Sequence, residues 1–179
     1  MPGKRVFISC GEPSGDFYGA ELVRHLRDQE PGIVTFGLGG DRLLEQGTRL
    51  IAHTKDLAVV GITEVIRHLH RLRVIYTSAV SEIRSAPPDL AILVDYPDIN
   101  LRFARQLRRL GVPVVYYVSP QIWAWKKGRI HAIRDTVTRM LVIFPFEEAL
   151  YQAAGVPVSF VGHPLVDAVR PAPDRGAFL

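Results

Sequence analysis

Two aspartates, at positions 95 and 98, are the residues best suited to acid–base chemistry. Pro97 lies between them, so Asp95 and Asp98 need not share one face. In a crevice either carboxylate could act as a general base. Alternatively, Asp95 or Asn100 only caps the following helix, a role that we favour for Asp95. Both roles stay open for Asp98, which the proline turns outward. The spacing is not the Asp-x-Asp of metal-dependent sugar transfer.

The segment Gly11–Asp16 has the composition of a turn that holds an anion or a sugar. It should join a strand to a helix, with Ser14, Gly15 and Asp16 where free backbone N–H groups and the helix dipole favour a phosphate or a hydroxyl. Glu12 belongs to the same cluster. The alternative is a capping turn, with Ser14 or Asp16 as the cap. The glycine spacing matches neither a Walker loop nor the dinucleotide fingerprint.

Two further turns carry weaker signals. Gly37–Gly40 would let the backbone approach a ligand closely, or it forms a simple turn. His163 follows a short apolar run and a glycine. It either contacts a ligand or is a hydrogen-bonded core histidine. No nucleophile stands at a recognisable spacing from it, and Gly11–Gly15 does not match a nucleophile elbow, which argues against a serine hydrolase.

Cationic residues gather in two stretches, 65–81 and 99–134, that contain no acidic residue. Such stretches attract phosphorylated ligands, anionic lipid headgroups or nucleic acid. Within the second, Trp123 and Trp125 stand beside a pair of lysines. That composition is typical of membrane interfaces and of sugar-binding sites, although one of the tryptophans could pack in the core.

The arginines of the first cationic stretch lie in an amphipathic segment, 62–73. One interpretation is a helix that faces the core and has a solvated basic side. The other is a helix that rests on an anionic membrane surface, with its apolar side in lipid. The residues that would face the membrane are Ile62, Ile66, Leu69, Arg67, Arg71 and Arg73.

Short β-branched runs alternate with longer segments of helical period, which predicts a parallel sheet with crossover helices. The strands are expected at 6–10, 33–36, 90–94, 114–118, 140–144 and 158–161. The helices are expected at 16–29, 41–46, 63–84, 101–110, 129–134 and 146–153. Gly111 and Gly155 each follow a helix and precede a Val-Pro pair that opens a strand. We therefore predict a doubly wound, Rossmann-like α/β fold, with the polar clusters at the carboxyl ends of strands, where such sheets bind ligands.

Length and composition are those of an ordinary globular protein, with 179 residues, 47% hydrophobic residues and a net charge of +4. Cys10 is the single cysteine, which excludes an internal disulfide and favours a reducing compartment. No apolar run approaches the roughly 18 residues that cross a bilayer, and no signal peptide is evident, so we expect a cytoplasmic location. We expect one domain over residues 1–169, then a linker and the truncated start of a second domain over 170–179.

Taken together, these clusters resemble the lipid-A-disaccharide synthase family. The resemblance runs through nearly the whole chain and corresponds to the amino-terminal half of that family's pattern. Its most specific segment reads Ser-Pro-Gln-Ile-Trp-Ala-Trp. In order, the matching segments are Gly11–Asp16, Gly39–Gly40, Val60–Val65, Asp95–Asn100, Tyr117–Trp125, Pro145–Glu147 and Phe160–Pro164.

The resemblance implies the N-terminal, acceptor-side domain of a glycosyltransferase-B fold, and an inverting transferase that uses no cofactor or metal. Members of the family transfer diacylglucosamine from UDP-2,3-diacylglucosamine to 2,3-diacylglucosamine 1-phosphate, giving lipid A disaccharide and UDP. Both lipids are thus implied partners, as are an anionic membrane surface and a second, UDP-sugar-binding domain. The implied location is cytoplasmic and peripheral on the inner membrane. The chain alone should be nearly inactive, because the second domain stabilises the departing diphosphate.

The resemblance also implies roles for single residues. Asp98 is the implied base, which deprotonates the acceptor hydroxyl as it attacks the anomeric carbon opposite UDP. The residues implied to contact the substrates are Glu12, Ser14, Gly15, Asp16, Gly39, Asn100, Ser119, Trp123 and His163. Two competing functions remain: a non-catalytic module for acylated sugar phosphate or a partner domain, and a basic nucleic-acid-binding domain. We disfavour the latter because no nucleic-acid fold signature is present.

Overall fold

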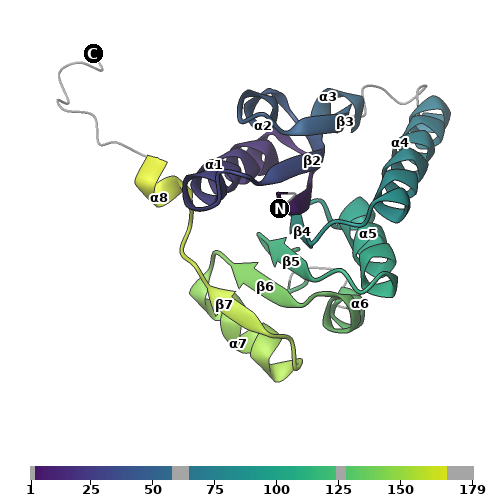
Figure 1. Cartoon of the computed structure of the whole chain (residues 1–179). Helices are drawn as coiled ribbons and strands as arrows, with labels where there is room; N and C mark the ends of the chain where they lie inside the picture. The colour runs from purple at the N-terminus through teal and green to yellow at the C-terminus, as the bar shows by residue number, and fades with distance from the viewer. Residues whose placement is uncertain (1–2, 58–64, 124–127, 169–179) are drawn as a thin grey trace, which may run out of the picture.

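A seven-stranded parallel sheet forms the centre of the protein. The computed structural model describes residues 3–57, 65–123 and 128–168 (Figure 1). In space the strands follow the order β3-β2-β1-β4-β5-β6-β7. Their bounds are β1 (Arg5–Cys10), β2 (Val34–Gly39), β3 (Arg49–His53), β4 (Leu90–Val94), β5 (Val114–Tyr117), β6 (Arg139–Val142) and β7 (Val158–Phe160).

The chain changes its direction of travel through the sheet after β3. β2 and β3 lie on one side of β1, and β4 to β7 lie on the other, so β1 and β4 are neighbours, with Cys10 opposite Val94. In open parallel sheets, ligands bind at such a switch point, beyond the carboxyl ends of the strands. The turns that follow β1 and β4 therefore lie side by side at the place where a ligand is expected.

Helices cover both faces of the sheet (Figure 1). Along β1, Ile8 belongs to the core beneath α1 and α2, whereas its neighbour Phe7 belongs to the core beneath α4 to α7. The predicted doubly wound fold is thus confirmed. The helices are α1 (Pro13–Gln29), α2 (Asp41–Glu45), α3 (Thr54–Leu57), α4 (Val65–Ser85), α5 (Pro97–Arg109), α6 (Arg129–Thr136), α7 (Pro145–Ala153) and α8 (Leu165–Ala168).

The sequence pattern of helix α5 explains how this helix packs against the sheet next to the switch point. Ile99, Phe103 and Leu107 recur every four residues and are buried, whereas the arginines between them are exposed. Burial of a side chain such as Phe103 contributes about 1.5–3 kcal/mol. Gly111, with a φ of 74°, follows the helix, as the sequence predicts. The apolar stripe therefore fixes how the first turn of α5 meets the sheet.

Two helices begin three or more residues earlier than the sequence predicts. Helix α1 starts at Pro13 instead of residue 16, and α5 starts at Pro97 instead of residue 101. Proline suits the first helical turn, because its fixed φ is already helical and its missing N–H would have no partner there. As a result Asp98 lies within the first turn of α5 and not in a loop before it.

The same shift corrects the capping roles considered for these turns. The residue at the N-cap of α1 is Glu12, so neither Ser14 nor Asp16 caps that helix. Tyr96 occupies the N-cap of α5, so the capping role that we favoured for Asp95, with Asn100 as its alternative, is wrong. The prediction also omitted β3, α3 and α8. β3 is a short edge strand in which only Ala52 is buried, and its apolar run is only three residues long, from Leu50 to Ala52.

Candidate functional site

A pocket of about 360 Å³ lies at the switch point, where the turns after β1, β4, β5 and β6 meet. Four carboxylates and one guanidinium from these turns line it. We call it the carboxylate pocket and define it by Glu12, Asp95, Asp98, Arg129 and Glu147. These residues come from four separate segments of the chain, so the fold brings together what the sequence spreads over 136 positions.

Asp98 stands at the rim of the carboxylate pocket. Its side chain is 69% exposed and forms an ion pair with Arg129, which is 13% exposed and begins helix α6. The first turn of α5 also favours a negative charge, because unpaired N–H groups and the helix dipole point toward it. The arrangement holds a carboxylate at a fixed place where a solvent-borne hydroxyl can reach it. Sequence reasoning missed Arg129 as a site residue, although it lies in the second cationic stretch.

Backbone strain is concentrated in the same pocket. Asp95, Tyr96 and Val118 all line it and have positive φ values of 45°, 44° and 61°. For side chains other than glycine, and above all for a β-branched valine, such a conformation costs about 1–3 kcal/mol and persists only where surrounding contacts enforce it. Strain of this kind clusters at functional sites, so it supports placing the site here independently of the carboxylates.

The side chain of Asn100 helps to hold this strained backbone in place. It is fully buried, and its Nδ2 lies 3.2 Å from the carbonyl oxygen of Ser9, 3.1 Å from that of Val94 and 2.7 Å from that of Asp95. The Tyr116 hydroxyl donates a further bond of 2.6 Å to the Asp95 carbonyl. Asn100 therefore ties the ends of β1 and β4 to the first turn of α5 from below the pocket.

Burial changes the acidity of two pocket carboxylates. It raises the pKa of Asp95, and the nearby negative charge of Glu12 raises it further, whereas a backbone N–H bond from Tyr96 opposes the shift. Burial likewise raises the pKa of Glu147, opposed by hydrogen bonds from Ser119, the Phe144 N–H and Trp123. Glu147 is 2% exposed. It links the start of α7 to the loop after β5.

Glu147 was not among the predicted site residues, although the segment 145–147 contributed to the family resemblance. Ser119 is buried beside it, and its hydroxyl lies 2.8 Å from the Tyr151 hydroxyl. Trp123 is exposed and packs edge-on against Phe146, with ring centroids 5.5 Å apart. Ser119 therefore lines the carboxylate pocket, and Trp123 stands on the surface next to it.

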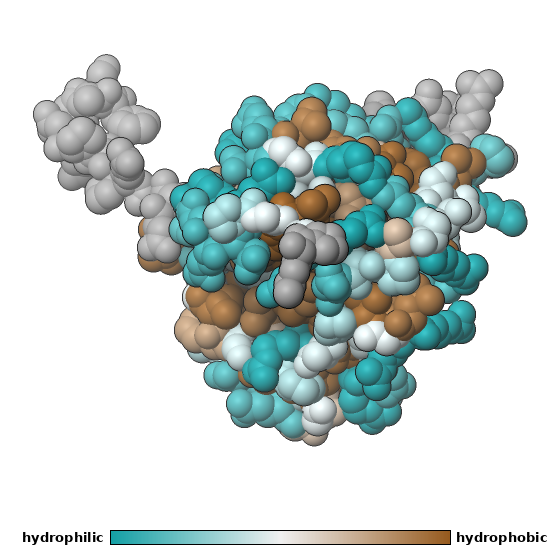
Figure 2. Space-filling model, in the orientation of Figure 1, coloured by the Kyte–Doolittle hydropathy of each residue, from teal (hydrophilic) through white to brown (hydrophobic). Residues whose placement is uncertain are grey.

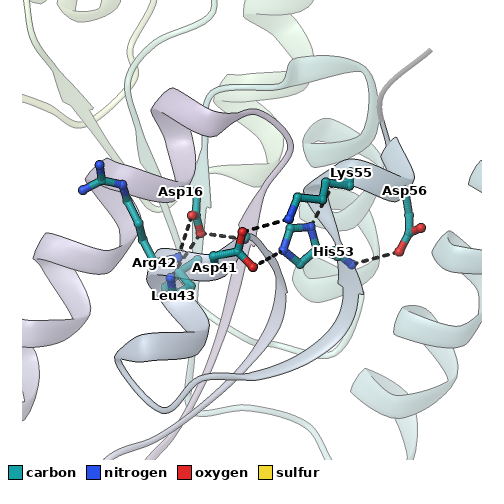
Figure 3. A network of polar contacts seen from close by, with 8 residues as sticks. Asp16, Asp41, Arg42, Leu43, His53, Lys55 and Asp56 are labelled. Atoms are coloured by element: carbon teal, nitrogen blue, oxygen red, sulfur yellow. Dashed lines mark hydrogen bonds and ion pairs between the residues drawn. The ribbon is translucent and has the colours of Figure 1, made fainter. Parts of the chain in front are cut away.

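The residues at the junction of β1 and α1 differ in their exposure to solvent. Glu12 and Ser14 are exposed, whereas Gly15 and Asp16 are buried. The Asp16 carboxylate accepts hydrogen bonds from the backbone N–H groups of Gly40 (2.6 Å), Arg42 (3.1 Å) and Leu43 (3.2 Å). It thereby caps helix α2 from a neighbouring helix (Figure 3). The structure places Asp16 in the scaffold that joins α1 to α2.

The paired glycines at the end of β2, Gly39 and Gly40, serve that same contact. A Cβ on Gly40 would lie 2.6 Å from the Asp16 carboxylate, and one on Gly39 would lie 2.5 Å from the Leu43 side chain. Next to them, Asp41 binds His53 Nε2 at 3.0 Å and Lys55 Nζ at 2.9 Å (Figure 3). Lys55 and then His53 hold the pKa of Asp41 below its usual value. The turns after β2 and β3 are thus locked together.

A second, larger pocket of about 760 Å³ lies between α1 and the segment 161–166. We call it the aromatic pocket and define it by Phe17, Tyr18, Tyr117, Val161 and His163. His163 contacts the Phe144 ring, with centroids 5.8 Å apart, and Phe144 itself lines the carboxylate pocket. His163 is therefore partly exposed between the two pockets and is not a core residue.

Among the predicted membrane-facing residues whose side chains the structure describes, Leu69, Arg71 and Arg73 line neither pocket. Ile62 falls outside the described residues, as do the side chains of Ile66 and Arg67, whose backbone begins α4. Leu69 and Arg73 are exposed, and Arg71 forms an ion pair with Asp56. Within the ranges that the structure describes, no helix is long and apolar enough to cross a bilayer, and no cluster of side chains could hold a metal ion.

The sequence matches one known protein family over nearly its whole length. A family model described as lipid-A-disaccharide synthetase matches residues 6–178. The lipid-A-disaccharide synthase of Geobacter sulfurreducens is 50% identical over 175 residues, which are 98% of this chain and 46% of that protein. That of Syntrophus aciditrophicus is 49% identical over 179 residues, 100% of this chain and 47% of that protein. The chain spans about half the length of the curated relatives it matches.

Two solved structures share the fold at low sequence identity. Glycyrrhiza uralensis UGT73P12, in complex with glycyrrhetinic acid 3-O-monoglucuronide, has a TM-score of 0.59 and 10% identity over 93% of this chain and 50% of its own. A ugt transferase from Siraitia grosvenorii in complex with UDP has a TM-score of 0.51 and 12% identity over 89% of this chain and 50% of its own. The predicted fold class, one half of a glycosyltransferase-B fold, is thereby confirmed.

Proposed function

The chain belongs to the lipid-A-disaccharide synthetase family, and we propose that it is the acceptor-binding half of an inverting glycosyltransferase of lipid A biosynthesis. In this proposal diacylglucosamine passes from UDP-2,3-diacylglucosamine to 2,3-diacylglucosamine 1-phosphate. The products are lipid A disaccharide and UDP. A second domain, which holds the UDP-sugar, completes the site, and the reaction takes place on the cytoplasmic side of an anionic membrane.

The observation that carries the proposal is the position of Asp98. It is an exposed carboxylate, held by an ion pair, in a pocket built from four loop segments at the sheet edge where ligands bind in this fold class. Inverting transfer requires that a base remove a proton from the acceptor hydroxyl while that oxygen attacks the anomeric carbon. Asp98 can take that proton, and the ion pair with Arg129 holds it in place to do so.

The other pocket residues have supporting roles in the proposal. Glu12 and Ser14 are exposed at the amino end of α1, beside the pocket, where they can hydrogen-bond sugar hydroxyls. Asn100 and Tyr116 preserve the strained backbone that sets the position of Asp98. Ser119 and Glu147 hold the loop after β5, which carries Trp123. No residue in this account needs to bind a metal or a cofactor.

Reconstitution of the two halves tests the proposal. The chain is mixed with, or fused to, the carboxyl-terminal half of a family relative, and both substrates are supplied. We expect release of UDP together with formation of the disaccharide lipid, and nearly none from this chain alone, because stabilisation of the departing diphosphate is then missing.

Two results would contradict the proposal. Robust turnover by this chain alone would show that it holds the UDP-sugar itself. Acceptor binding without any turnover in a folded, reconstituted protein would favour the non-catalytic module instead. Binding of the acylated sugar phosphate by the isolated chain, followed by calorimetry, separates that second case from loss of folding.

A further inference from the structure

The aromatic pocket has the size and lining of a site for a hydrocarbon chain. Its volume of about 760 Å³ lies within the roughly 300–1,000 Å³ of ligand pockets, which are lined mostly by apolar and aromatic side chains. Its walls are the rings of Phe17, Tyr18 and Tyr117 and the aliphatic side chains of Leu22 and Val161. Such walls stabilise a ligand chiefly by removing apolar surface from water.

The charged groups at this pocket are arranged for a neutral occupant. Arg24 lies at its edge, but its guanidinium is 3.0 Å from the Glu21 carboxylate and 3.7 Å from that of Asp28. These acidic partners offset the positive charge that a phosphate would need. The pocket therefore suits a hydrocarbon chain better than an anionic headgroup.

The aromatic pocket adjoins the site already described. Phe144 lines the carboxylate pocket, and its ring contacts the ring of His163, which lines the aromatic pocket. Phe144 also stacks on Phe146, and Phe146 meets Trp123 edge-on, so a row of aromatic side chains extends from the boundary between the two pockets. Because the pockets adjoin at Phe144 and His163, one molecule could place a sugar in the first and a hydrocarbon chain in the second.

The outer wall of the aromatic pocket leaves apolar side chains in water. Val161, Leu165 and Val166 are exposed where β7 leads into α8, and Figure 2 shows brown, apolar side chains on the left of this face, over that region. An exposed apolar patch beside a pocket is typical of a binding surface, because burial of the patch by a ligand is favourable.

We propose that the aromatic pocket binds one acyl chain of the acceptor lipid while the sugar of that lipid occupies the carboxylate pocket. This inference rests on the proposed function for the identity of the lipid. It assigns acyl recognition to the segments 17–22 and 161–166, which lie outside the catalytic residues.

Photo-crosslinking locates the bound acyl chain directly. The probe is 2,3-diacylglucosamine 1-phosphate with a diazirine near the end of one acyl chain, bound to this protein and irradiated. We expect labelled peptides that contain residues 17–22 or 161–166, and we expect unlabelled lipid to compete. Competed label on α4 instead would overturn the inference but leave the proposed function standing. Absence of any competed label would count against both.

A variant series tests the same pocket by acyl length. Each buried methylene of the lipid strengthens binding by roughly fourfold. The affinity of the wild-type protein should therefore fall by about that factor for each methylene removed from the acyl chain. Val161→Asp places a charge in the wall and should flatten this dependence, as should Val166→Asp. Val34→Asp is the matched control, because Val34 is 50% exposed against 48% for Val161 but lies at the opposite end of the sheet.

The outcome separates the possible occupants. A flattened dependence in both pocket variants, with the control unchanged, supports an acyl chain. An affinity loss that is equal for long and short acyl chains would instead mean that another segment of polypeptide covers the pocket, and would overturn the inference. Unchanged binding in both variants would overturn it as well. Circular dichroism of each variant shows that folding is intact.

Discussion

At the scale of single residues, Asp16 has the clearest structural task. It is buried, and it accepts bonds from three backbone N–H groups at the start of α2. Replacing it with alanine leaves those donors without their partner. Because hydrogen bonds to charged groups contribute about 1.5–3 kcal/mol, we expect Asp16→Ala to lower the free energy of unfolding by at least about 2 kcal/mol, measured by urea denaturation.

Two variants frame the Asp16 experiment. Gly40→Ala should destabilise by a similar route, because the added Cβ collides with the same carboxylate. Ser14→Ala, on the exposed side of the same turn, should leave stability nearly unchanged. Equal stability of Asp16→Ala and the wild type would show that the α1–α2 contact is dispensable, and would return Asp16 to the list of substrate-binding candidates.

Glu147 provides a prediction about pH. Burial raises its pKa in the folded protein above the ordinary value of 4.5. The stability that this group contributes is therefore present below pH 4.5 and is lost as the pH rises through the raised folded pKa. In Glu147→Gln this titration is absent. The unfolding free energy of the variant minus that of the wild type should thus increase from pH 4 to pH 7.

Urea denaturation at several pH values measures that difference. Glu148→Gln, the adjacent and less buried position of α7, is the control for the loss of one charge. A difference for Glu147→Gln that falls with rising pH would mean that its hydrogen bonds from the loop after β5 outweigh its burial.

At the scale of elements, β1, β4 and α5 are joined by one side chain. Asn100→Ala removes the donor shared by three buried carbonyl groups. Each buried polar group left unpaired costs about 1–3 kcal/mol, so we expect a loss of roughly 2–4 kcal/mol in unfolding free energy. Gln106→Ala, on the exposed side of the same helix, is the control and should cost much less. A loss below about 1 kcal/mol would contradict the conclusion that Asn100 joins β1, β4 and α5.

The elements differ in how far the sequence determines them. Leu90–Val94 is an apolar run flanked by polar residues, and its predicted bounds are those observed for β4. Edge strand β3 has only the short apolar run from Leu50 to Ala52, and most of its side chains are only partly buried or exposed. The apolar stripe of α5 predicts that helix, but its first turn depends on Pro97 being read as a start and not as a turn.

The candidate site was predictable only in part, for a related reason. The convergence of polar turns at one sheet edge follows from the fold class, and the exposed position of Asp98 follows from Pro97. The hydrogen-bond and ion-pair partners of these residues cannot be predicted from the sequence pattern. Arg129 stands 31 positions from Asp98, and Gly40 stands 24 positions from Asp16. Local patterns carry no information about such pairs, so Arg129 was missed and the bonds from Asp16 to the start of α2 were not predicted.

At the scale of the whole molecule, the positive charge predicts attraction to anionic membranes. The net charge is +4, and Arg73, one of the predicted membrane-facing residues, is exposed on α4. Each basic residue near an anionic surface contributes about 1 kcal/mol. Arg73→Glu changes the charge by two, so it should weaken binding to vesicles that contain phosphatidylglycerol by roughly tenfold or more. Vesicle sedimentation measures this.

Salt and a control variant complete the vesicle experiment. Binding should decline as ionic strength rises, because screening shortens the reach of exposed charges. Arg139→Glu, at the start of β6, should change the affinity much less than Arg73→Glu. Equal effects of the two variants would mean that net charge alone, and not the α4 surface, governs the attraction.

The most direct test of the whole account is the turnover number of Asp98→Asn in the reconstituted two-half enzyme. General base catalysis contributes about 10²–10⁴-fold, so turnover should fall by at least about a hundredfold while acceptor binding is largely kept. Asp135→Asn, a similarly exposed aspartate that pairs with Arg134, should be nearly as active as the wild type. Turnover of Asp98→Asn within a few-fold of the wild type would contradict the assignment of Asp98 as the base.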